Sequence, residues 1–133
     1  MKKKILLPIV IDYDNKQLFV STLELAGKLS ADVICFTSVA DEWNLDRAYL
    51  HYLGLYGHYQ TTTNNWSKEL PNVKKVMRIG IMLHQVAKYL KQTEIDIVIS
   101  NPKSNVLDAN FLEMMLVGSP YKPEIITFDK LAS

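Results

Sequence analysis

Short apolar runs alternate along this chain with segments of helical period. The runs lie at residues 5–11, 32–39, 73–79, 95–100 and 124–128, and the first is apolar at every position. A strand that buries both of its faces is typical of a parallel sheet covered by helices on each side. The alternation therefore predicts an α/β fold with three layers, five parallel strands and about four helices.

Helix signals fill the gaps between the apolar runs. Asp12 or Asp14 is the predicted N-cap of the first helix, and helical spacing then covers residues 44–59 and continues into a polar loop at 61–65. Gly80 leads into a third amphipathic segment. Asp108 and Gly118 suit the two caps of a short fourth helix. The predicted buried stripe of the first helix consists of Leu18, Thr22, Leu25, Ala26 and Leu29.

Length, composition and charge narrow the class of protein. The 133 residues predict a single domain over 1–133, and 48% apolar with 22% charged residues is typical of a soluble globular protein. A formal net charge of +1 argues against a nucleic-acid binder. The longest apolar stretch, 5–11, is too short to span a membrane. The lone cysteine, Cys35, cannot form an internal disulfide, which fits a cytoplasmic location.

Three stretches together resemble the universal stress protein family. The first comprises KILLPI at 4–9, LELA at 23–26 and LSADVI at 29–34. The second comprises VMRIG at 76–80, AKYL at 87–90 and IDIVI at 95–99, and the third is SPYKP at 119–123. The resemblance implies a Rossmann-like or flavodoxin-like parallel sheet in the order 3-2-1-4-5, and a homodimer.

The resemblance also raises the question of ATP. Nucleotide-binding members of the family carry three spaced glycines after the fourth strand, because bare backbone amides must approach the phosphates closely. Here Asn101 and Ser104 replace the first two glycines, and the third falls near Ala109 or Asn110. We therefore expect no ATP binding in the family manner and no cofactor.

An altered adenine-nucleotide site for ATP or AMP is the alternative hypothesis. Asp12 would supply the family's acidic group if its loop were shifted, since the ungapped alignment places Val10 there. The polar loop would supply donors to phosphate, although Asn, Pro and Ser are also ordinary turn residues. The residues of this degenerate site are Ile9, Val10, Asp12, Val39, Asn101, Lys103, Ser104 and Asn105.

The segment 49–59 is rich in tyrosine, at Tyr49, Tyr52, Tyr56 and Tyr59. Helix packing against the sheet or a surface for a protein partner is the favoured interpretation, and a small-molecule pocket is the alternative. His51 and His58 are two helical turns apart, too far to share one metal ion, so no metal site is predicted. Trp43 and Trp66 flank the segment and are predicted to fill the core.

No pattern in the sequence indicates catalysis. G-x-S-x-G, P-loop, C-x-x-C and H-E-x-x-H motifs are all absent. We therefore predict a non-catalytic protein, and the family resemblance implies that it acts in stress response by association. The resemblance to family dimers also implies a dimer through the last strand, from Glu124 to Phe128, whose unpaired edge would otherwise invite aggregation.

Overall fold

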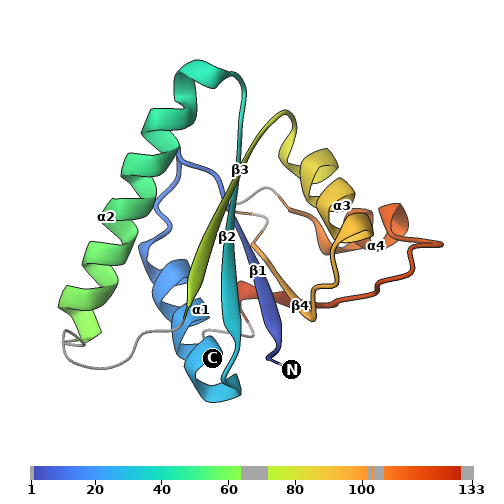
Figure 1. The fold of residues 1–133 in the computed structure, drawn as a ribbon, viewed down its shortest axis with the longest axis horizontal. Helices are drawn as coiled ribbons and strands as arrows, with labels where there is room; N and C mark the ends of the chain where they lie inside the picture. Colours follow the sequence, from blue (N-terminus) through green and yellow to red (C-terminus); the bar gives the residue numbers. More distant parts are fainter. Residues whose placement is uncertain (1, 64–71, 102, 104–106, 130–133) are drawn as a thin grey trace.

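Five parallel strands form one sheet in the order β3-β2-β1-β4-β5. The structure, a computed structural model, describes residues 2–63, 72–101, 103 and 107–129 (Figure 1). The strands are β1 (Lys4–Ile9), β2 (Asp32–Val39), β3 (Val73–Ile79), β4 (Ile97–Ser100) and β5 (Glu124–Thr127). The predicted parallel sheet and its strand order are confirmed.

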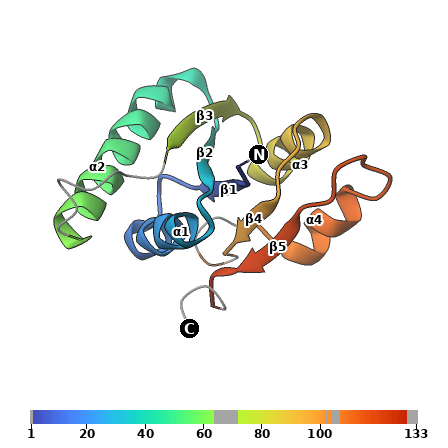
Figure 2. The same ribbon diagram turned by 60° about the horizontal axis from the view of Figure 1, so that its bottom comes forward.

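Four helices cover the two faces of the sheet. They are α1 (Lys16–Leu29), α2 (Leu45–Thr63), α3 (Met82–Gln92) and α4 (Ala109–Met115), and a 3-10 turn, η1 (Glu42–Asn44), precedes α2. Figures 1 and 2 show α1 and α2 on one face, with α3 and α4 on the other. No helix in the described ranges is both long and apolar enough to cross a membrane.

Each face of the sheet has its own apolar core, and β1 contributes to both. Ile5, Leu7 and Ile9 point into the core under α1 and α2, whereas Leu6 points into the core under α3 and α4. This division follows from the alternation of side chains along a strand. Cys35 lies in the first core, where burial raises the pKa of its thiol and keeps it neutral. It is packed as a small apolar side chain.

Several predicted boundaries are wrong. The residue that caps α1 is Asn15, not Asp12 or Asp14, although Asp14 Oδ1 accepts a hydrogen bond from the backbone amide of Lys16 at 3.1 Å. β1 stops at Ile9 because the next carbonyl, that of Val10, turns to accept from the backbone amide of Tyr13. Leu29, predicted to be buried, is 38% exposed.

The predicted loop at 61–65 is wrong where the structure describes it, because α2 continues to Thr63. Thr61 Oγ1 donates to the carbonyl of Gly57 at 3.0 Å, and Thr62 Oγ1 lies 3.2 Å from His58 Nε2. These contacts one turn back join the polar side chains to the helix itself. At α4, Asp108 caps the helix as predicted, whereas the C-cap is Leu116 and not Gly118, which has a φ of +82° two residues later.

Candidate functional site at the carboxyl edge of the sheet

The carboxyl ends of β1 and β4 lie side by side, where the winding direction of the sheet reverses. The two strands pair with Leu6 opposite Val98, so Ile9 and Asn101, each three residues further on, reach the same edge. In open parallel sheets, ligands bind beyond this edge. The edge is therefore the candidate site for a small ligand.

The predicted base-binding residues are mostly inside the protein. Ile9 is 1% exposed and Val39 is 5% exposed, and both belong to the buried core. Val10 is half-buried and packs against the core beneath α3 and α4. Only Val10 of these three offers appreciable surface to a ligand.

Asp12 is directed toward α2. Its Oδ1 lies 3.2 Å from Arg47 Nη2, in an ion pair whose side chains are both well exposed. An exposed ion pair contributes little free energy in water, so the Asp12 carboxylate can leave Arg47 for another partner. The structure gives Asp12 a partner on the helix rather than a place beside Asn101.

A buried hydrogen bond joins the two ends of the segment after β4. Ser100 Oγ donates to the carbonyl of Leu107 at 2.6 Å, and both residues are fully buried. Within this segment, Asn101 Oδ1 accepts from the backbone amide of Lys103 at 3.2 Å, while the predicted donors Ser104 and Asn105 lie outside the described residues. Ser100, a polar residue at the end of an apolar strand, is the one feature of the sequence that indicates this hydrogen bond.

A hollow of about 190 Å³ lies where β4 and β5 end. Asn101 and Lys103 line it, so the structure brings these two predicted residues together. The opposite wall of the hollow comes from the end of β5 and was not predicted. Its residues are Thr127, Phe128 and Asp129. They could be assigned only once β5 was known to lie beside β4.

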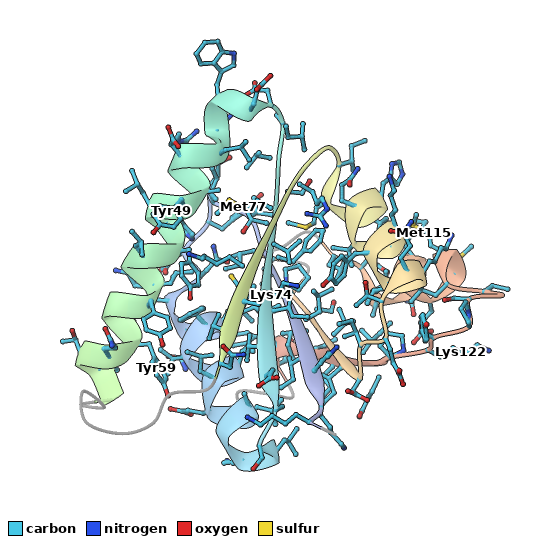
Figure 3. All side chains as sticks on the ribbon, in the orientation of Figure 1. Tyr49, Tyr59, Lys74, Met77, Met115 and Lys122 are labelled. Carbon is cyan, nitrogen blue, oxygen red and sulfur yellow. The ribbon has the colours of Figure 1, made fainter. Side chains whose placement is uncertain are left out.

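The tyrosines of α2 pack against α1. The rings of Tyr52 and Tyr59 meet Phe19 edge-on, at centroid distances of 6.1 and 6.4 Å, and both residues are buried. Burial raises the pKa of Tyr52 and, to a smaller extent, that of Tyr56. Figure 3 shows Tyr49 toward the start of α2 and Tyr59 near its end. Only Tyr49, which is exposed, and Tyr56, which is half-buried, could reach a partner.

Trp43, unlike Tyr52 and Tyr59, lies on the surface. It was predicted to fill the core, but it projects from η1 and is 89% exposed, while Trp66 lies outside the described residues. Within the described part of the chain, no group of three or more His, Cys, Asp or Glu side chains is arranged to hold a metal ion.

Comparisons with known proteins place the fold. No protein-family profile and no curated protein sequence matches the chain. A universal stress protein solved in complex with cAMP has a TM-score of 0.65 at 9% identity, with 95% of each chain covered. The universal stress protein from Archaeoglobus fulgidus has a TM-score of 0.59 at 6% identity, covering 96% of this chain and 93% of its own.

This chain has the universal stress protein fold. A third structure, of a hypothetical protein whose biochemical function was assigned from its structure, has a TM-score of 0.54 at 15% identity, covering 96% of this chain and 95% of its own. Universal stress proteins and this chain thus share the arrangement of strands, with little sequence in common. Function has to be argued from the residues of this chain.

Proposed function

We propose that this protein acts by association in stress response, without catalysis, as a homodimer that forms through the free edge of β5. The observation that supports the proposal is the apolar character of that edge. Among the described residues, β5 pairs with β4 on one side only, and its middle residues, Ile125 and Ile126, are half-buried. An unpaired apolar edge exposes backbone donors and acceptors that another strand can satisfy.

The surface beside β5 continues this apolar character. The outer side of α4 and the residues after it expose Phe111 at 59%, Met114 at 68% and Val117 at 80%. A hollow of about 220 Å³ between α4 and β5 is lined by Val117 and Ile125 among others, and Figure 2 shows the two elements next to each other. An apolar face next to an open edge favours a partner that also brings an apolar strand.

A second copy of this chain fits this surface. A two-fold axis perpendicular to the sheet would pair two β5 strands antiparallel, and side chains directly opposite each other then lie on the same face of the joined sheet. A register centred on Ile126 meets this condition, because it sets Ile126 opposite its own copy and Ile125 opposite Thr127, and all three residues are half-buried. The centre of such a self-complementary interface would be apolar.

Sedimentation velocity over a range of protein concentrations tests the proposal. We expect a two-subunit species at micromolar concentration, together with hydrogen exchange at residues 124–127 that slows as the dimer forms. Residues 73–79, on the opposite edge, should keep their exchange rates. A strict monomer at high micromolar concentration, or protection at β3 rather than β5, would contradict the proposal.

Adenine-nucleotide binding is the second candidate function. The solved neighbour with cAMP has the same fold, and the hollow beyond β4 and β5 contains one cation, Lys103, beside the amide of Asn101. At about 190 Å³ the hollow is smaller than most small-molecule pockets, so it would hold a phosphate group rather than a whole nucleotide.

Thermal unfolding with ATP, AMP and cAMP tests this candidate. A ligand at a hundredfold excess over its Kd adds about 2.7 kcal/mol to stability, which raises the melting temperature by several degrees in a protein of this size. Lys103→Gln should remove that rise, and the surface variant Lys88→Gln should keep it. No rise at millimolar nucleotide would eliminate the candidate.

A further inference from the structure

A groove of about 570 Å³ lies between the start of α1 and the middle of α2. Both helices cover the same face of the sheet (Figure 1), so the groove is distinct from the β5 edge and from the hollow beyond β4. Asp14, Asn15 and Lys16 line it from α1, and His51, Gly54 and Leu55 line it from α2. The volume is within the range of pockets that hold small molecules.

Asn15 is the central polar residue of this groove. It is 1% exposed, and its Nδ2 donates to the carbonyls of Val10 at 2.9 Å and Tyr13 at 3.0 Å. The same nitrogen lies 3.0 Å from His51 Nε2. An amide nitrogen can only donate, so its two hydrogens are shared among these three acceptors, and the ring proton of a neutral His51 is on Nδ1. Burial lowers the pKa of His51, against the opposing effect of Asp14 and Asp12.

One end of the groove has an unsatisfied acceptor beside a helix start that is only partly capped. Asn15 occupies the N-cap position of α1, but its side-chain amide is engaged with the preceding loop and makes no capping hydrogen bond. Asp14 Oδ1 accepts from the first amide alone, that of Lys16, so the positive end of the helix can still attract an anion. Asn15 Oδ1 is buried and has no hydrogen-bond partner among the described residues. A buried acceptor without a donor is destabilising, so this atom favours a ligand that brings a donor.

The charges at the rim also have both signs. The ammonium group of Lys16 and the partly capped start of α1 attract an anion, whereas Asp14 and the oxygen of Asn15 attract a cationic donor. An inorganic anion would satisfy only the first set. Asp14 and Lys16 are exposed, so their side chains can rotate to admit a ligand to the enclosed oxygen of Asn15.

Gly54 provides room for an apolar group. A Cβ atom built on Gly54 meets nothing within 4 Å outside its own stretch of helix, and Leu50, 64% exposed and one turn earlier, contributes apolar surface to the same groove. His58 lines the groove one turn further along α2. The groove thus combines a dipolar end with an apolar wall.

We propose that this groove binds a free α-amino acid with an apolar side chain. The carboxylate is received by the start of α1 and by Lys16, the ammonium group by Asp14 and Asn15 Oδ1, and the side chain by the wall at Gly54 and Leu50. This inference does not depend on dimerisation or on nucleotide binding.

NMR titration of the full chain with L-leucine, L-methionine and L-phenylalanine tests the proposal. We expect saturable shifts of the backbone amides of Lys16 and Gly54 by at least one of the three at about 10 mM, the concentration that saturates a millimolar site. Leucinamide lacks the carboxylate and 2-hydroxy-4-methylpentanoate lacks the ammonium group, so each should bind about tenfold more weakly than leucine, or worse. Absence of saturable shifts with all three amino acids, or equal binding of the hydroxy acid, would overturn the proposal.

Two glycines of α2 provide a matched pair of variants. Gly54 and Gly57 both have open space around a built Cβ atom, but only Gly54 lines the groove. We expect Gly54→Leu to weaken binding at least about tenfold, with Gly57→Leu unchanged, while both keep or raise the melting temperature because glycine disfavours a helix interior. Equal affinity in the two variants would overturn the assignment of the site.

Discussion

The two edges of the sheet differ in how they are protected. β3 carries three exposed cations, Lys74, Lys75 and Arg78, along seven residues. β5 has one exposed charge, Glu124, and is otherwise half-buried. Figure 3 shows Lys74 on β3, while Lys122, which precedes β5, lies on the far side of α3 near α4. Charged side chains on an edge strand oppose pairing with other chains, so the contrast points to β5 as the edge available to a partner.

The cations of β3 are also held in place by aromatic rings. Lys75 Nζ lies 4.5 Å from the ring centroid of Tyr49 and 5.0 Å from that of Tyr52, both on α2. On the other face, the Arg78 guanidinium lies 5.9 Å from the ring of Tyr89. The tyrosines of α2 thus help to keep the charged side chains along this edge. Side chains close the β3 edge, whereas no described strand pairs with the outer edge of β5.

The largest expected effect is a loss of folding stability when a charge is placed at the buried position of β3. Val76 is the one buried residue of this strand, at 6% exposed, and it pairs with Phe36. Val76→Asp would bury an unpaired carboxylate and should lower the free energy of unfolding by about 3 kcal/mol or more. Urea denaturation followed by circular dichroism measures this change. Lys74→Asp, on an exposed position of the same strand, should stay within about 0.5 kcal/mol.

Charges placed beside β5 should separate the dimer without unfolding the protein. Met114→Asp with Val117→Asp puts two like charges on the exposed apolar face, and we expect Kd for dimerisation to rise about a hundredfold. Sedimentation velocity measures Kd. The control is Leu53→Asp on α2, which likewise replaces an exposed apolar residue and should leave Kd unchanged. A dimer that persists in the double variant would place the interface elsewhere.

At the β3 edge, removing one cation should have a small effect. Lys75→Met keeps the length of the side chain but loses the attraction to Tyr49 and Tyr52, which is worth about 0.5–1 kcal/mol. Chemical denaturation should detect this decrease. The same change on the exposed Lys88 of α3 should have no measurable effect.

The smallest expected effect is a decrease in folding stability at alkaline pH, which is absent at neutral pH. Burial raises the pKa of folded Tyr52 above its ordinary value of 10.0. Below pH 10 both the folded and the unfolded protein hold the phenol proton; above it the unfolded protein loses that proton first, so stability falls. Urea midpoints between pH 8 and 11 should show this decline. Tyr52→Phe should make it less steep, with the remainder coming from Cys35 and Tyr56, whose pKa values are also raised.

The fold could be predicted because its strands are short and apolar at most positions. β2 and β3 have the predicted bounds, and Asp108 caps α4 as expected. The errors lie at segment ends, where local contacts decide. The threonines after Gly57 resemble a loop, yet Thr61 bonds back to the helix. Trp43 was assigned to the core by its size, but it lies in η1, outside both cores.

The candidate sites were harder to predict because distant segments form them. Asn101 and Lys103 were found by their place after β4, but Phe128 and Asp129 join them only through the pairing of β4 with β5. The sequence favoured the neighbouring aspartates as the N-cap and did not indicate Asn15. The contact that distinguishes Asn15 is with His51, 36 residues further along the chain. Ile9 and Val39 were expected to meet a ligand, and burial excludes most of their surface.

The central place of β1 has a consequence for the order in which the chain is made. β1 pairs with β2 on one side and with β4 on the other, and β4 begins only at Ile97. On the ribosome, therefore, the segment that ends with β3 can assemble its three strands while one flank of β1 is still bare. Until the second half arrives, the bare flank of β1 exposes backbone groups that another strand could pair with.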